Sequence, residues 1–118
     1  YNAETSQVVA GTEAAIAALE LRLGGETAHR RLQTSHAFHS PLMDGVLDGF
    51  RRCLEGVALR APDRRFVSNL TGDWVDPQRC ATPDYWVEHL RLPVRFHQAL
   101  RTLAAEADVI LEVGPGRS

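Results

Sequence analysis

The 118-residue sequence contains no lysine, so all 13 of its basic residues are arginines. Together with 15 acidic residues they give a formal net charge of −2, which offers no electrostatic reason to bind nucleic acid. No apolar run approaches the roughly 18 residues needed to cross a bilayer. Because lysine is absent, residues 112–116 cannot form a Walker-type phosphate loop, and we predict a turn after a strand there. We therefore expect no nucleic-acid partner and no membrane partner.

Cysteine is also scarce. Cys53 and Cys80 lie far apart and have neither the spacing of a zinc site nor the density of a secreted disulfide scaffold, so we predict reduced thiols and a cytoplasmic location. The first residues, 1–5, are polar, lack an initiator methionine and do not resemble a signal peptide. The last residues, 114–118, stop abruptly at a turn. We expect this sequence to be part of a larger protein.

Segments typical of strands alternate with segments typical of helices. Short β-branched or apolar runs predict strands at residues 6–10, 30–34, 64–70 and 108–113. Helical spacing of apolar residues, with capping and glycine or proline signals at the ends, predicts helices at residues 12–23, 41–55, 84–90 and 96–103. A turn is predicted at 71–73, followed by a loop that runs to residues 82–83. This alternation predicts an α/β fold.

Two histidines, His36 and His39, lie immediately before the strongest helix start. Ser40 is suited to cap that helix and Pro41 to occupy its first turn, which places His39 at the helix entrance. A helix start carries roughly half a positive elementary charge, which disfavours a second positive charge nearby. We therefore predict that the imidazole of His39 is neutral and able to accept a proton.

The residues alone leave the role of this pair open. A zinc site needs at least three protein ligands, and the other histidines are scattered along the chain at positions 29, 89 and 97. Two alternatives remain, namely structural histidines that bond loop backbone and a general base for a hydroxyl nucleophile. None of the serines lies in a Gly-x-Ser-x-Gly elbow, so a nucleophile would lie upstream.

Several sequence blocks occur in an order that we recognise. They are Tyr1-Asn2 with residues 8–11, then residues 32–43 with their Ser35-His36-Ala37-Phe38-His39-Ser40-Pro41 core, 67–72, 85–91, 93–96 and 111–116. Together they resemble the C-terminal half of the acyltransferase domain of modular type I polyketide synthases, related to malonyl-CoA:acyl carrier protein transacylases.

The resemblance implies a fold and a reaction. Residues 1–34 would end a ferredoxin-like small subdomain, and residues 35–118 would form the C-terminal part of an α/β-hydrolase-like large subdomain. In that family a serine attacks the thioester of an acyl-CoA, and the acyl group then passes to the phosphopantetheine thiol of an acyl carrier protein. The serine, an oxyanion-hole glutamine and the arginine that pairs with malonyl all belong upstream of this sequence, so the chain alone is expected to be inactive.

The resemblance also implies roles for particular residues. His39 matches the catalytic histidine, which takes the serine proton and returns it to the departing thiol. His36, Ala37, Phe38 and His39 match a motif that accompanies malonyl selection, and Phe38 is expected to fill the space that an α-methyl would need. His89 and Asn2 match positions near the active site; His89 equally suits simple packing beside Trp86.

No metal and no bound cofactor are implied for this domain, since acyl-CoA is a substrate and the phosphopantetheine belongs to the carrier. The implied partners are malonyl-CoA or a related acyl-CoA, an acyl carrier protein, the upstream half of the same domain and the neighbouring domains of a multifunctional antibiotic synthase. Two alternatives remain open: a catalytically dead remnant that still binds the carrier protein, and a serine/histidine acyl hydrolase.

Overall fold

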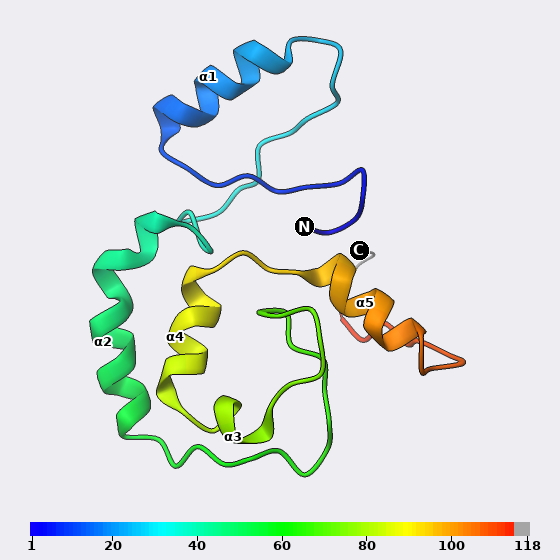
Figure 1. Cartoon of the computed structure of the whole chain (residues 1–118). Coiled ribbons are helices and arrows are strands. Elements are labelled where there is room, and N and C mark those ends of the chain that lie inside the picture. Colours follow the sequence, from blue (N-terminus) through cyan, green and yellow to red (C-terminus); the bar gives the residue numbers. More distant parts are fainter. Residues whose placement is uncertain (115–118) are drawn as a thin grey trace.

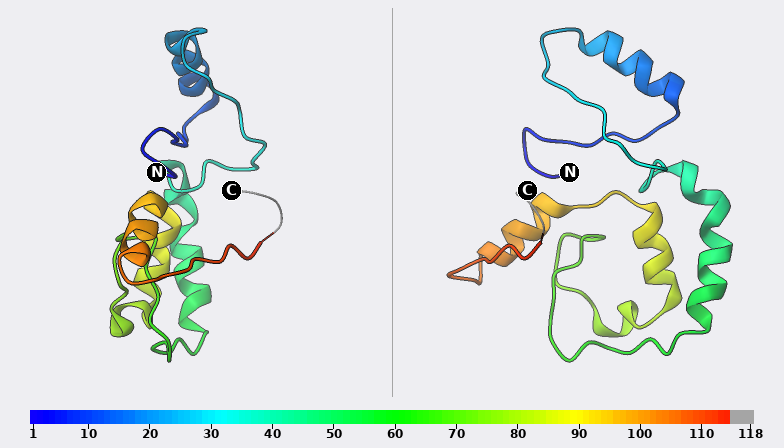
Figure 2. Two further views of the ribbon diagram at one scale, coloured as in Figure 1. Left: turned by 90° about the vertical axis from the view of Figure 1, so that its right-hand side faces the viewer. Right: turned by 180° about the vertical axis from the view of Figure 1, so that it is seen from behind.

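The computed structural model describes residues 1–114, in which helices are joined by long irregular segments (Figure 1). The elements in chain order are α1 (Glu13–Leu23), the 3₁₀ helix η1 (Pro41–Met43), α2 (Asp44–Glu55), α3 (Pro77–Cys80), α4 (Pro83–Arg91) and α5 (Phe96–Ala104). α2 and α4 lie side by side, and α3 packs against α4, whereas α1 and its flanking segments lie apart (Figures 1 and 2). None of the helices described is long and apolar enough to span a membrane.

The four predicted helices are confirmed, and the sequence marks the start of three of them with a capping residue or a proline. Thr12 caps α1 by accepting a hydrogen bond from the amide of Ala15 at 3.3 Å, and Gly24 ends it at a positive φ of 57°. Ser40 caps the next helix by accepting from the amide of Leu42 at 3.2 Å. That predicted helix begins as η1 and continues as α2.

One short helix was not predicted. α3 interrupts the segment that we expected to be a loop, and Asp76 starts it by accepting from the amides of Gln78 at 2.9 Å and Arg79 at 3.4 Å. Pro77 occupies its first position, where a missing N–H costs nothing. The start signal was present in the sequence, but a helix of one turn has too few residues to show an apolar period.

The four strand predictions are wrong for the described residues, which contain only isolated bridges between Ala3 and Ser6 and between Val67 and Trp74. A strand is stable only when another strand pairs with it, and apart from the single bridge at Ser6 no segment within residues 1–114 pairs with 6–10, 30–34 or 108–113. Residues 109–113 have no regular secondary structure and are exposed instead of buried. The α/β architecture therefore stays a prediction, and the predicted turn at residues 114–116 lies largely outside the described residues.

Around the predicted third strand the chain forms a tight reversal. The amide of Val75 donates to the carbonyl of Phe66 at 3.0 Å, and the amide of Ser68 donates to the carbonyl of Asp73 at 2.8 Å. The predicted turn is confirmed by Gly72, whose φ is +76°. This reversal packs on α5, because the hydroxyl of Thr102 donates to the carbonyl of Gly72 at 2.8 Å.

The core lies between this reversal and the helices α3 and α4. Leu70, Cys80 and Tyr85 are buried together, with partly buried Phe66, Val75 and Trp86 packed against them. Cys80 is buried in this core, whereas Cys53 is exposed, and neither is part of a disulfide. The core fixes α4, and the end of α4 contacts the histidine-containing turn.

Candidate active site

The turn before α2 is closed by Ser40, whose side chain is buried. Its hydroxyl donates to the carbonyl of Ala37 at 2.6 Å and accepts from the amide of Leu42 at 3.2 Å. One side chain therefore both closes the turn that contains His39 and starts the following helix.

His39 has a φ of 58°, the only positive value among the non-glycine residues described. This left-handed conformation costs a residue with a Cβ about 1–2 kcal/mol. Its amide donates to the carbonyl of Leu90 at 3.3 Å, so the strained residue is held against the end of α4. Strain of this kind is concentrated at functional sites, where the surroundings impose it.

The ring of His39 is held by two backbone carbonyls. Its Nδ1 lies 3.1 Å from the oxygen of His89 and 3.1 Å from the oxygen of Leu92. A carbonyl oxygen can only accept, so Nδ1 carries a proton, and in the neutral ring Nε2 is the basic nitrogen. No residue within 1–114 makes a hydrogen bond to Nε2. The ring is therefore arranged to take a proton at Nε2.

The charge environment of His39 differs from the sequence prediction. The residue precedes a helix start, as predicted, but its ring faces the carboxyl end of α4, where the backbone dipoles leave a partial negative charge. The electric field at His39 therefore comes from two helix ends with opposite partial charges, the start of the helix that follows His39 and the carboxyl end of α4. The prediction that His39 is neutral stays untested.

His89 lies beside His39, with ring centroids 6.1 Å apart and the planes at 73°. Its ring also lies 6.2 Å from that of Tyr85 and 6.2 Å from that of Trp86. Burial lowers the pKa of His89, and the positive charge of His39, when that ring is protonated, lowers it further. His89 is therefore neutral at pH 7, and both predicted placements of its side chain, next to His39 and beside Trp86, are observed together.

The rest of the predicted motif lies on the same turn. The ring of Phe38 is 5.9 Å from that of His36, and it lines an open groove of about 820 Å³ with Met43, Val46 and Leu90. The carbonyl of Ala37 accepts the bond from Ser40. The other three motif residues therefore lie on the segment that leads into His39, the histidine that we predict to be the base.

Asn2 is not joined to this group by any contact described. Its amide donates to the carbonyl of Ser6 at 3.1 Å. The neighbouring Tyr1 contacts the first turn of α5, since its carbonyl accepts from the amide of His97 at 3.0 Å. The structure thus brings together His36, Ala37, Phe38, His39 and His89, but not Asn2.

No serine among residues 1–114 is hydrogen-bonded to His39. Ser35 lies 3.0 Å from Nδ1 of His36, but both side chains are exposed and no third group orients that imidazole. Ser68 is buried and bonds to Tyr85. The prediction that the nucleophile lies upstream stays a prediction. The described residues also contain no group of three or more His, Cys, Asp or Glu able to hold a metal ion.

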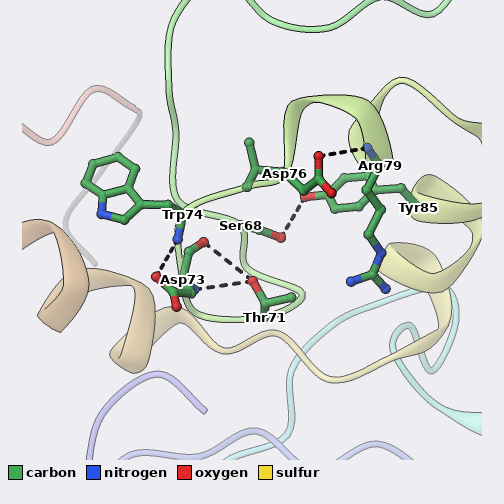
Figure 3. Close-up of a pocket in the computed structure, with 8 residues that line it drawn as sticks. Ser68, Thr71, Asp73, Trp74, Asp76, Arg79 and Tyr85 are labelled. Carbon is green, nitrogen blue, oxygen red and sulfur yellow. Dashed lines mark hydrogen bonds between the residues drawn. The ribbon is translucent and has the colours of Figure 1, made fainter.

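A second cavity, of about 230 Å³, was not predicted (Figure 3). Ser68 and Tyr85 point toward each other in it, and their oxygens are 2.6 Å apart. Asp76 lines it too but is engaged in capping α3. The cavity therefore marks where α4 is tied to the chain reversal, and Tyr85 extends from it to His89.

Comparisons with known proteins identify the family of this chain. A sequence profile of the family described as "Acyl transferase domain" matches residues 1–116. Polyketide synthase GfsB of Streptomyces halstedii is 51% identical over 87 residues, which are 73% of this chain and 2% of GfsB. The spectinabilin polyketide synthase system protein NorB of Streptomyces orinoci is 40% identical over 120 residues, covering 97% of this chain and 5% of NorB.

A solved structure gives the same result. The acyltransferase domain of SpnD, in complex with 2-(pent-4-yn-1-yl)malonyl, aligns with a TM-score of 0.77 and 33% identity, over 81% of this chain and 24% of that chain. The chain belongs to the acyl transferase domain family. Within that family, it is part of the acyltransferase domain of a modular polyketide synthase, as the resemblance predicted. The division into subdomains at residues 1–34 and 35–118 stays a prediction.

Proposed function

We propose that His39 is the general base of an acyltransferase that loads an extender unit, malonyl, onto an acyl carrier protein. The observation that carries this proposal is the pair of carbonyls bonded to Nδ1, because they leave Nε2 as the proton acceptor. A serine outside this chain attacks the acyl-CoA thioester, its proton passes to Nε2, and the proton then goes to the departing CoA thiolate. The phosphopantetheine thiol of the carrier repeats the cycle on the serine ester.

Malonyl selection is assigned to the turn around His39. Phe38 stands beside the base and presents a bulky ring, which supports exclusion of an α-methyl from the acyl group. One methyl is worth only about 1–3 kcal/mol in a pocket, so the discrimination by Phe38 is incomplete. The SpnD relative was solved with a substituted malonyl, which supports a malonyl-type donor for this chain too.

Removal of the imidazole tests the proposal. In the complete acyltransferase domain, the form in which the SpnD relative was solved, we expect His39→Ala to slow serine acylation by labelled malonyl-CoA roughly 10²–10⁴-fold. His29→Ala is the matched control, because that histidine is exposed and bonds only to the carbonyl of Thr27. Acylation at the wild-type rate in His39→Ala would overturn the role of His39.

The same assay separates the two alternatives. An acyl-enzyme that decays in water as fast as it decays with carrier protein would identify a hydrolase. Absence of any acylation in the wild-type domain, with carrier protein still bound, would identify a catalytically dead remnant. Residues 1–118 alone are expected to show no transfer, because the nucleophile lies elsewhere.

A further inference from the structure

The carbonyls that hold His39 come from the end of α4, whereas His39 itself precedes α2. Its three hydrogen bonds to that helix end have lengths of 3.3, 3.1 and 3.1 Å. Ordinary N–H···O bonds centre near about 2.9–3.0 Å, so these contacts are at the long end of the range. The orientation of the ring therefore depends on what else holds the two segments together.

An ion pair joins the start of α2 to the end of α4, close to the carbonyls that bond to His39. Nε of Arg91 donates to a carboxylate oxygen of Asp44. Arg91 lies between Leu90 and Leu92, whose carbonyls bond to His39, and Asp44 is the first residue of α2. The side chain of Arg91 is 27% exposed, the lowest value for any arginine in the ion pairs described for residues 1–114.

We propose that Arg91 and Asp44 are positioning residues for His39, an inference that rests on the proposed role of His39 as the base. A partly exposed ion pair contributes little to stability, about 0–1 kcal/mol. A displacement of about 1 Å at a reacting group, however, can cost roughly a hundredfold in rate. Loss of this pair therefore affects the rate of the chemical step more than it affects folding.

The molecule provides a matched control. A second ion pair, between Arg51 and Asp84, joins the same two helices at their other ends, since Arg51 is near the end of α2 and Asp84 near the start of α4 (Figure 1). It involves the same residue types and tethers the same helices. It is far along both helices from the carbonyls that bond to His39.

The first experiment measures single-turnover acylation of the complete acyltransferase domain by labelled malonyl-CoA. We expect Arg91→Ala and Asp44→Ala each to lower the limiting rate constant roughly tenfold or more, without changing the half-saturating concentration. Arg51→Ala is expected to stay within about twofold of wild type, because surface ion pairs contribute little. An equal loss in Arg51→Ala, or no loss in Arg91→Ala, would overturn the proposal.

Conservative variants distinguish charge pairing from packing. Arg91→Lys and Asp44→Glu retain the charges and are expected to keep most of the rate that the alanine variants lose. Failure of both to do so would overturn the positioning role.

The second experiment does not depend on acyl transfer. Nitrogen NMR of the ¹⁵N-histidine-labelled domain is expected to show the Nδ1–H tautomer of neutral His39 in the wild type and in Arg51→Ala, and a mixture of tautomers in Arg91→Ala. An unchanged His39 signal in Arg91→Ala would overturn the inference. If His39→Ala acylates normally, the proposed function fails, and the NMR comparison still tests the positioning of the ring.

Discussion

Residues 1–34 and residues 35–104 are held in different ways. No side chain in residues 1–34 is buried, and α1 is stabilised by its caps and by Arg31, which bonds to both carboxylate oxygens of Glu20 at 2.8 Å and to Glu13 at 2.7 Å. The Arg31 guanidinium lowers the pKa of Glu20. Residues 35–104, by contrast, contain every buried apolar side chain among the described residues, on η1, the chain reversal, α3, α4 and α5. The proposed site is built entirely in the second region.

The difference in burial between the two regions indicates that the geometry of the site is determined by residues 35–104. Apart from the contacts that Tyr1 and Glu4 make with residues 94 and 97, the contacts described for residues 1–34 are local and solvent-exposed, so each contributes little. The carbonyls that hold His39 are on a helix anchored through Tyr85, which is 2% exposed and bonds to Ser68. Substitutions that test the comparison are therefore expected to have unequal effects in the two regions.

The largest difference is expected for a pair of truncations. Tyr85→Ala removes a buried ring and leaves Ser68 without its partner, so we expect a loss of about 3–5 kcal/mol in the free energy of unfolding. Leu21→Ala, on α1, removes a side chain that is 85% exposed and is expected to change it by less than about 0.5 kcal/mol. Urea unfolding of the complete domain measures both. Equal losses of unfolding free energy in the two variants would show that other polypeptide covers α1. The two regions would then not differ in burial.

A smaller difference in stability is expected between alanine variants of two glycines, Gly24 and Gly72, that both have positive φ. Gly24 has open space where a Cβ would lie, so Gly24→Ala carries only the backbone cost of about 1–2 kcal/mol. A Cβ on Gly72 would lie 2.8 Å or less from three carbon atoms of Gln98, which adds about 1–3 kcal/mol of overpacking. Thermal unfolding compares the two variants. Equal destabilisation would mean that the reversal moves away from α5 at no cost.

The smallest effect on the free energy of unfolding is expected from a change in pH. Burial lowers the pKa of His89 in the folded chain, so below the ordinary histidine value of about 6.5 the unfolded chain binds more protons. The stability contributed by neutral His89 is complete above that pH and is lost as the pH falls toward its lowered folded pKa. Unfolding free energies at pH 7.5 and 5.5 should differ less in His89→Gln than in wild type. His29→Gln, an exposed ring in residues 1–34, should retain the wild-type difference.

The sequence predicted the elements whose signals are local. Thr12 and Gly24 bound α1, and Ser40 with Pro41 starts the helix after the proposed base, because caps act within one turn of the chain. The motif around His39 was found for the same reason. Its residues are neighbours in sequence and lie on one turn in the structure.

Contacts between distant residues could not be predicted in this way. The carbonyls of His89 and Leu92 lie 50 and 53 residues from His39, and no periodicity connects them. The strand at residues 108–113 was predicted from an apolar run, but pairing needs a partner that the pattern does not identify. The ion pair between Arg91 and Asp44 also joins residues 47 positions apart, and neither position stood out among the many charged residues.

The end of α4 has a consequence for how a basic imidazole is presented. In a helix that continued, the N–H of residue 93 would bond to the oxygen of His89, but Pro93 has no N–H to give. Because Pro93 cannot donate to it, the oxygen of His89, one of the two that accept from Nδ1–H of His39, has no intrahelical hydrogen-bond donor. A break in regular structure thus supplies the acceptor that elsewhere in proteins is often an aspartate carboxylate.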